Sequence, residues 1–115
     1  MRRGEIWLIN LDPTIGSEIK KTRPAVIVSE NAIGLLPLKV VVPITDWKSR
    51  FATAPWMVRL EADRRNGLKK TSAADAFQVR SVSQLRFVSR QGILSPEAMA
   101  EISRALSIVL DIPQS

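Results

Sequence analysis

Short apolar runs separated by turn residues fill most of the chain up to Gly92. Several runs alternate apolar with polar side chains, as half-buried strands do, and others are rich in valine and isoleucine, which favour strands. Proline, glycine and the pair Asn66-Gly67 lie between the runs, and these residues favour turns. The pattern predicts a small sheet of short strands that ends at Gly92. The predicted strands are residues 5–11, 25–29, 39–45, 56–61, 72–79 and 83–88.

The residues after Gly92 carry the signals of a helix. Ser95 is a typical cap residue, Pro96 suits the first helical position, and Glu97 adds an acid to the first turn. Four apolar residues then recur at helical spacing, which predicts an apolar face packed on the sheet. The predicted fold class is therefore mainly β with a C-terminal α-helix (α+β), a small curled sheet or barrel plugged by the helix. The stripe consists of Met99, Ile102, Leu106 and Val109.

Two prolines add detail to the predicted strands. Pro24 holds the residue before it extended and gives the second strand a fixed start. Pro43 lies within the third strand and lacks the N–H that a ladder uses, so it predicts an edge position or a bulge. Residues 31–37 are predicted to be an irregular connector with one helical turn, and residues 46–55 are predicted to be a loop.

The composition fits one globular domain of 115 residues, with 45% hydrophobic and 24% charged side chains. We expect residues 1–112 to form this domain and residues 113–115 a short tail. Histidine and cysteine are absent, which excludes disulfides, thiol nucleophiles, catalysis by imidazole and the metal sites that these side chains form. No stretch is long and apolar enough to span a membrane and no signal-peptide core is seen, so we expect a cytoplasmic location.

Positive charge is concentrated in the predicted sheet. The chain has a formal net charge of +6, whereas the residues from Gln91 onward hold one base and three acids, a net of −2. The first ninety residues therefore carry +8. An anionic ligand is expected to bind there rather than on the helix.

Residues 16–24 gather one carboxylate, two lysines and an arginine in a loop flanked by turn residues. A guanidinium offers a planar fork of donors that matches a phosphate, and lysines add positive potential. The loop is therefore a candidate phosphate site, and a solvated loop with the arginine in a surface ion pair is the alternative. The charged residues are Glu18, Lys20, Lys21 and Arg23.

Three further features are candidates for binding nucleic acid. Thr45 ends the third strand, where its hydroxyl either only terminates the strand or holds a phosphate oxygen beside an arginine. Trp47 and Lys48 begin a loop in which aromatic residues interleave with basic ones, a pattern that suits stacked bases and paired phosphates, with core packing as the alternative. Gln78, closely followed by Arg80, either reads a base edge or satisfies buried backbone groups.

Seven motifs resemble, in order and spacing, those of the MazF/PemK/Kid family of type II toxin–antitoxin toxins, and they cover nearly the whole chain. They are RGEIW at 3–7, LDP at 11–13, GSE at 16–18, RPAV at 23–26, VPIT at 42–45, QVRS at 78–81 and SP at 95–96. The resemblance implies a small SH3-like barrel of the MazF/PemK/CcdB type with a C-terminal helix, working as a homodimer.

The resemblance also implies a sequence-specific endoribonuclease that cleaves single-stranded RNA (mRNA) without a metal or other cofactor and is neutralised by an acidic cognate antitoxin. The family's active-site arginine and threonine match Arg23 and Thr45, and its glutamate after Gly-Ser matches Glu18, the nearest candidate base. RNA supplies its own nucleophile, the 2′-hydroxyl, so the protein need only align the strand and stabilise charge on phosphorus. The candidates for RNA binding are Lys20, Lys21, Trp47, Lys48, Gln78 and Arg80.

Two positions depart from the family pattern. Phe77 stands where several relatives have an acid before the glutamine, and Ser17 stands where some have a histidine. An alternating strand would put Asp75 on the same face as Phe77, where it is a candidate substitute. Two other functions stay open: a non-catalytic toxin of the same fold that inhibits DNA gyrase by binding, and a decayed toxin that keeps only antitoxin binding.

Overall fold

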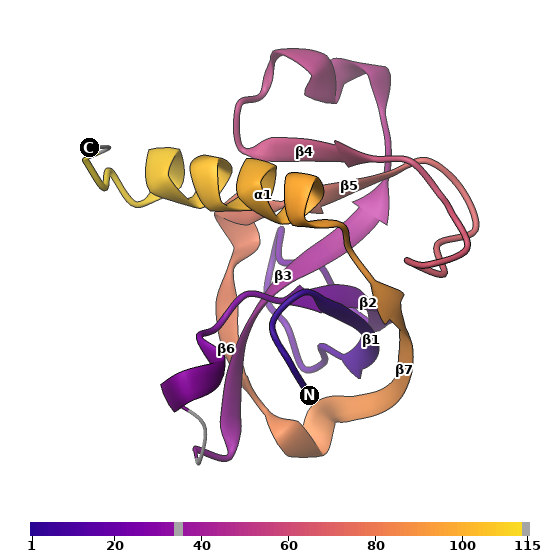
Figure 1. The fold of residues 1–115 in the computed structure, drawn as a ribbon, viewed down its shortest axis with the longest axis vertical. Coiled ribbons are helices and arrows are strands. Elements are labelled where there is room, and N and C mark those ends of the chain that lie inside the picture. Colours follow the sequence, from indigo (N-terminus) through magenta and orange to yellow (C-terminus); the bar gives the residue numbers. More distant parts are fainter. Residues whose placement is uncertain (34–35, 114–115) are drawn as a thin grey trace.

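In residues 1–33 and 36–113, which the computed structural model describes, the chain forms seven strands, one α-helix and four short 3-10 helices (Figure 1). The strands are β1 (Glu5–Asn10), β2 (Thr22–Ile27), β3 (Leu38–Asp46), β4 (Met57–Leu60), β5 (Ser72–Asp75), β6 (Arg80–Ser83) and β7 (Phe87–Ile93). The α-helix is α1 (Pro96–Val109), and the 3-10 helices are η1 (Asn31–Ile33), η2 (Ser49–Thr53), η3 (Ala76–Gln78) and η4 (Gln84–Arg86).

The strands form one antiparallel sheet in the order β4-β5-β3-β2-β1-β7, with β6 paired to the first half of β3. Among the described residues no pairing joins β4 to β7, so the sheet curls without closing into a barrel. The helix α1 lies across the part of the sheet formed by β4 and β5 (Figure 1). The predicted fold class, mainly β with a C-terminal helix, is confirmed. Of the predicted tail, residues 114–115 lie outside the described residues.

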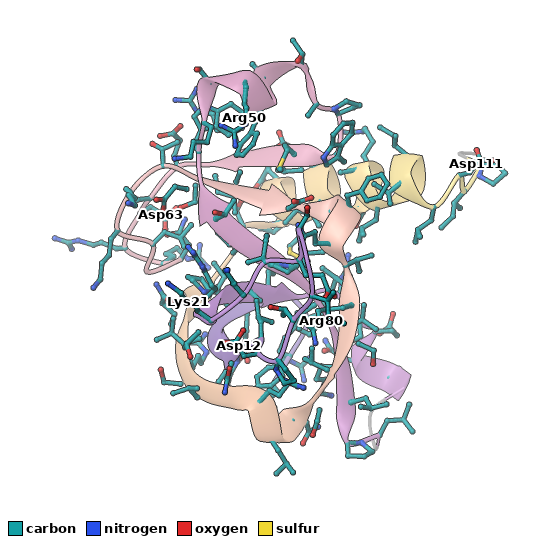
Figure 2. The ribbon with its side chains drawn as sticks, turned by 180° about the vertical axis from the view of Figure 1, so that it is seen from behind. Asp12, Lys21, Arg50, Asp63, Arg80 and Asp111 are labelled. Atoms are coloured by element: carbon teal, nitrogen blue, oxygen red, sulfur yellow. The ribbon has the colours of Figure 1, made fainter. Side chains whose placement is uncertain are left out.

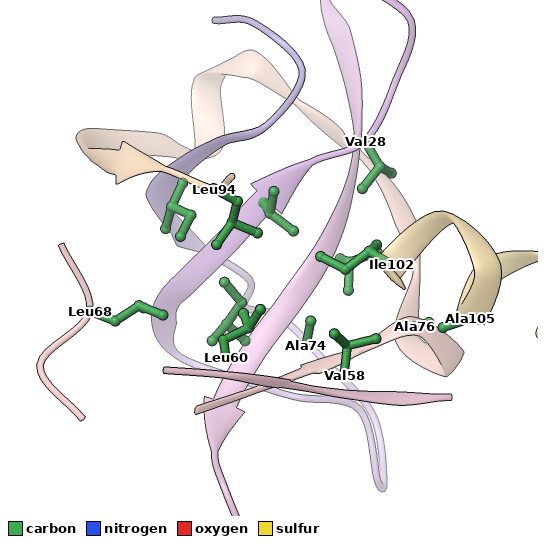
Figure 3. Close-up of a cluster of buried hydrophobic side chains, with 13 residues drawn as sticks. Val28, Val58, Leu60, Leu68, Ala74, Ala76, Leu94, Ile102 and Ala105 are labelled. Atoms are coloured by element: carbon green, nitrogen blue, oxygen red, sulfur yellow. The ribbon is translucent and has the colours of Figure 1, made fainter. Parts of the chain in front are cut away.

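Apolar side chains form two clusters on opposite faces of the curled sheet. The first core cluster lies between the sheet and α1, and it joins Ile102 and Ala105 of the helix to strand residues such as Val58 and Ala74 (Figure 3). The second core cluster draws on residues that alternate with those of the first along the strands. Because both faces are covered, β2 and β3 appear in the sequence as nearly continuous apolar runs. The second core cluster consists of Ile9, Leu11, Ala25, Ile27, Val41 and Val82.

Helix α1 begins as predicted. The Ser95 hydroxyl accepts the backbone N–H of Ala98 at 3.1 Å, and Pro96 occupies the first helical position. Ile102 is fully buried, and the other three residues of the predicted stripe pack at the margin of the first core cluster. No helix within the described residues is long and apolar enough to cross a membrane.

The prediction that Pro43 marks an edge strand or a bulge is wrong. β3 is a central strand, with β2 on one side and β5 and β6 on the other. Pairing with β6 ends at Val41 and pairing with β5 begins at Ile44. Pro43 lies between these two pairings, and on that side of β3 no ladder bond requires the N–H that proline lacks.

The predicted strands at 72–79 and 83–88 are also interrupted. The Asp75 carboxylate accepts the N–H of Phe77 at 3.1 Å, which ends β5 and starts η3. The Ser83 hydroxyl likewise accepts the N–H of Leu85 at 3.1 Å and starts η4 between β6 and β7. Such local bonds from a side chain to the backbone compete with the strand ladder.

Glu5 at the start of β1 is held by a network of donors. Its Oε1 accepts bonds from the backbone N–H of Arg2 and from Trp7 Nε1, both at 3.0 Å, and its Oε2 lies 3.3 Å from Arg90 Nε. Burial alone would raise the pKa of the Glu5 carboxyl. The hydrogen bonds from Trp7, Arg2 and Arg90, with the nearby N-terminal charge, outweigh burial and lower that pKa from 4.5 to about 2.

Glu5→Gln is expected to lower the free energy of unfolding at pH 7 by about 1 kcal/mol, the size of a partly solvated charged hydrogen bond. The folded-state pKa lies below the unfolded value, so this contribution is complete above pH 4.5 and is lost as pH falls toward about 2. Urea unfolding of both proteins between pH 7 and pH 2 measures the difference. A gap that stays constant as the pH falls would contradict this assignment.

Candidate active site

Arg23 and Thr45 lie near the adjoining ends of two neighbouring strands, β2 and β3. The pairing of these strands ends at Ala25 and Pro43, and Arg23 and Thr45 each lie two residues beyond this last pair. Opposed residues of an antiparallel pair project to the same face. This is the face of the second core cluster, because Arg23 alternates with Ala25 and Thr45 with Val41. Both side chains are half-buried, and we call them the facing pair.

The terminal nitrogens of the Arg23 guanidinium have no hydrogen-bond partner among the described residues. Its Nε donates to the backbone carbonyl of Lys20 at 3.3 Å. Within residues 1–33 and 36–113, no carboxylate lies within 4.0 Å of it. The surface ion pair that the sequence left open therefore does not form in the described part of the chain, and the fork is available to a phosphate.

A carboxylate that the motifs did not single out lies beside the facing pair. Asp46 follows Thr45 directly, and its Oδ2 lies 3.0 Å from Nζ of Lys70. The hydrogen bond from Lys70 is the main reason that the pKa of Asp46 lies below its ordinary value, and the charges of Lys70, Lys48 and Arg23 act in the same direction. Asp46 is therefore an ionised carboxylate whose charge interacts with that of Arg23 and which forms an ion pair with Lys70.

The loop between β1 and β2 is closed at its base and carries Glu18 near its tip. The N–H of Leu11 donates to the carbonyl of Lys21 at 3.0 Å, and the N–H of Lys21 donates to Asp12 Oδ1 at 3.1 Å. Lys21 has a φ of 72°, the left-handed conformation that lets the chain turn into β2. The exposed Glu18 carboxylate accepts the N–H of Ile15 at 2.7 Å. No contact joins it to the facing pair among the described residues.

Gln78 of η3 holds the tip of the same loop. Its Oε1 accepts the N–H of Ile19 at 2.6 Å, and its Nε2 donates to the carbonyl of Ser17 at 3.1 Å. Both the oxygen and the nitrogen of the Gln78 amide are therefore hydrogen-bonded to backbone groups, as the alternative to base readout supposed. A contact of Gln78 with an RNA base stays a prediction. An open groove runs along this contact, lined by Ser17, Glu18, Phe77, Gln78, Val79 and Arg80.

Gln78→Ala is expected to free the loop tip, because two hydrogen bonds worth about 1 kcal/mol each are removed. The backbone N–H of Ile19 should then exchange with deuterium at least about tenfold faster. Gln84→Ala is the matched control, since its amide holds a different loop through the carbonyl of Leu36. Equal exchange of the Ile19 amide in Gln78→Ala and the wild-type protein would contradict the role of Gln78.

Trp47 and Lys48 follow directly after β3. The Trp47 ring packs edge-on against Phe51, with centroids 5.8 Å apart, and the Arg59 guanidinium lies 5.2 Å from the Trp47 centroid. Neither aromatic residue belongs to a core cluster of the described residues. The pair forms a half-buried aromatic surface beside exposed Lys48, which favours contact with a ligand over the core packing considered as the alternative.

Three cations predicted to bind RNA remain to be placed: one supports the β1–β2 loop and two face solvent. Arg80 Nη1 donates to the carbonyl of Leu11 at 3.2 Å and so supports the base of the β1–β2 loop. Lys20 and Lys21 are exposed on that loop (Figure 2 labels Lys21 and Arg80). Their charges add to the positive potential around the facing pair.

Asp75 does not occupy the place of the missing acid. It is 6% exposed and caps η3, whereas Phe77 is 64% exposed and packs edge-on against Trp56 at 5.9 Å. Burial raises the pKa of Asp75, and hydrogen bonds from the N–H groups of Phe77 and Gln78 counter it only in part. The two side chains do not share a strand face, because β5 ends at Asp75, so that prediction is wrong.

The open antiparallel sheet, the C-terminal helix and the facing pair of an arginine and a threonine together indicate the class of protein. This chain belongs to the family of PemK-like, MazF-like toxins of type II toxin–antitoxin systems, whose sequence model matches residues 2–110. It is 37% identical to endoribonuclease MazF9 of Mycobacterium tuberculosis (97% of this chain, 98% of the relative). It is 36% identical to endoribonuclease PemK of Escherichia coli (96% and 82%).

Solved structures agree on the fold. MazF from Deinococcus radiodurans superposes with a TM-score of 0.82 at 24% identity and covers 97% of each chain. An endoribonuclease in complex with its cognate antitoxin, from a mycobacterial species, superposes with a TM-score of 0.78 at 22% identity, over 100% of this chain and 99% of that one. The open sheet with its C-terminal helix is therefore the fold of this family.

Proposed function

We propose that this protein is an endoribonuclease toxin that cleaves single-stranded RNA, mRNA in particular, at a phosphodiester bound by Arg23 and Thr45. The observation that carries the proposal is the facing pair, in which a guanidinium whose terminal nitrogens have no partner among the described residues and a hydroxyl lie just beyond the last pair of two adjacent strands. Relatives named endoribonuclease, at 36% and 37% identity over nearly the whole chain, support the activity.

In the proposed reaction the 2′-hydroxyl of the RNA loses its proton and its oxygen attacks the adjacent phosphorus. The bond from phosphorus to the 5′-oxygen breaks and that oxygen gains a proton, which leaves a 2′,3′-cyclic phosphate and a 5′-hydroxyl. Arg23 stabilises the added negative charge and Thr45 donates to a non-bridging oxygen, while Glu18 acts as the base. The residues assigned to RNA binding are Lys20, Lys21, Trp47, Lys48, Gln78 and Arg80.

The experiment that tests this function is cleavage of a mixed-sequence RNA by purified protein in EDTA, with both new ends mapped. Fragments with a 2′,3′-cyclic phosphate and a 5′-hydroxyl are expected, and their sequences would give the cleavage motif. Intact RNA would contradict the proposal. Inhibition of DNA gyrase without any RNA cleavage would instead assign the chain to the non-catalytic toxins.

Asp46→Asn is expected to raise kcat/KM for RNA by about two- to fivefold at low salt. The substitution removes a negative charge that repels the bound phosphate and offsets part of the Arg23 charge, and a screened charge–charge interaction of this kind is worth under about 1 kcal/mol. Glu97→Gln, which neutralises an exposed acid of α1, is the matched control and should leave kcat/KM unchanged. A lower kcat/KM for Asp46→Asn would show that the carboxylate assists the reaction.

We also propose a single domain over residues 1–112 that works as a homodimer in the cytoplasm, where mRNA is found, and binds an acidic cognate antitoxin. A mycobacterial endoribonuclease of the same fold has been solved with its cognate antitoxin, and a net charge of +6 suits an acidic partner. Ile108 and Leu110 leave apolar surface exposed at the end of α1, which supports a protein–protein contact there.

A further inference from the structure

The loop between β4 and β5 carries a cationic surface that the proposed reaction does not use. We call residues 61–71 the basic loop. Figure 2 shows that the basic loop, marked by Asp63, stands out from the sheet, on the same side of that view as Lys21. Its four cations are all exposed. They are Arg64, Arg65, Lys69 and Lys70.

Buried contacts hold the basic loop in one shape. Asn66 is 3% exposed, its Nδ2 donates to the carbonyl of Glu61 at 2.8 Å, and its Oδ1 accepts the N–H of Leu68 at 2.9 Å. The Leu68 side chain belongs to the first core cluster. Gly92 of β7 packs so closely that a Cβ there would lie 2.4 Å from the carbonyl oxygen of Arg65. The loop is therefore a packed part of the fold and presents its cations from a fixed backbone.

The acids of the basic loop leave its cations largely unneutralised. Glu61 pairs with Arg59 of β4 at 2.8 Å. Asp63 uses its carboxylate to accept two backbone N–H groups of its own turn, at 2.7 and 2.8 Å. Within the part of the chain that the structure describes, Lys70 alone among the loop's cations has a carboxylate partner. The three cations without one are Arg64, Arg65 and Lys69.

The basic loop joins the active site at Lys70. Its Nζ lies 3.0 Å from Asp46, which follows Thr45 of the facing pair. The next residue, Trp47, donates its backbone N–H to the carbonyl of Thr71 at 3.2 Å. An RNA strand bound at the facing pair would therefore pass close to the cations of the basic loop on one side of the site.

We propose that the basic loop is a second docking surface for single-stranded RNA, and that Arg64, Arg65 and Lys69 bind phosphates flanking the cleaved bond. The proposal rests on the proposed function, which places an extended RNA at the facing pair. An acidic peptide is the less suitable ligand, because peptides that fold on binding are anchored by apolar side chains. No large apolar side chain of residues 61–71 is exposed, whereas phosphates need only cations.

The test compares a short RNA, the mapped cleavage motif alone, with the same motif extended by about ten uridines on each side, within the range that single-strand binding sites cover. The variant is R64Q/R65Q/K69Q. Its kcat/KM for the long RNA should fall about tenfold or more at low salt and that for the short RNA less than about twofold. The slope of log kcat/KM against log salt should become shallower by about 2, at about 0.7 per lost phosphate contact.

A second triple variant, R2Q/K39Q/R104Q, removes the same charge elsewhere and should keep the wild-type ratio between the two RNAs. Equal losses on short and long RNA in the basic-loop variant would overturn the proposal. So would unchanged cleavage with weakened antitoxin binding, which would assign the loop to a protein partner. If the wild-type protein cleaves no RNA, no motif can be mapped and the proposed function fails. Fluorescence anisotropy of a labelled oligouridine, with the wild-type protein and the basic-loop variant, then decides separately whether the loop binds single-stranded RNA.

Discussion

Arg23→Ala is expected to lower kcat for RNA cleavage by about 10²–10³-fold, the loss usual for removing one preorganised donor to a transition-state charge. Arg23 and Thr45 each lie two residues beyond the last β2–β3 pair, and Arg23 has no ion pair among the described residues that would hold it elsewhere. Loss of the guanidinium should therefore affect the chemical step directly, and single-turnover cleavage with the RNA fully bound measures it.

Arg23→Lys separates the charge from the shape of the group. Lysine keeps the positive charge but lacks the planar fork that fits two phosphate oxygens, so an intermediate loss of about tenfold is expected. Circular dichroism and a thermal melt should show both variants folded, because within the described part of the chain the Arg23 side chain makes one hydrogen bond, to the carbonyl of Lys20. Wild-type kcat in Arg23→Ala would remove this residue from the reaction.

Ile102→Ala should produce the largest loss of stability, a decrease of about 2–5 kcal/mol in the free energy of unfolding. Ile102 is 0% exposed and attaches α1 to the sheet through the first core cluster. Truncation leaves a cavity in a place where the curled sheet cannot collapse onto the helix. Urea denaturation of the purified variant measures the change.

Leu85→Ala is the control for that experiment. It removes a similar number of carbon atoms from a side chain that is 96% exposed, so a change of less than about 0.5 kcal/mol is expected. A loss for Ile102→Ala as small as that for Leu85→Ala would mean that α1 contributes little to the core.

Local signals predicted most of the fold. Turn residues and apolar alternation located β1, β3 and β4 to within a residue or two, and the cap at Ser95 located α1. The errors arose where a contact outside the strand pattern decides the outcome. Pro43 is compatible with a central strand because two different strands share one side of β3. β5 stops at Asp75 because a carboxylate caps η3, and strand propensity does not contain that bond.

The candidate site was predictable in its residues but not in its contacts. Arg23 and Thr45 came from motifs in the sequence, and the pairing of β2 with β3 brings these residues, 22 positions apart in the chain, to adjoining strand ends. The hydrogen bonds of Gln78 to the β1–β2 loop join residues about sixty positions apart in the chain, and the ion pair of Asp46 with Lys70 joins residues 24 positions apart. Neither contact produces a periodic pattern in the sequence, because each depends on how β3, β5 and η3 pack.

The most direct test of the central claim is a crystal structure of the protein bound to RNA that carries a 2′-O-methyl group at the cleavage position, which prevents attack. The Arg23 guanidinium and the Thr45 hydroxyl are both expected to contact non-bridging oxygens of the phosphate at that position. A scissile phosphate bound elsewhere, or touched by only one of the two side chains, would contradict it.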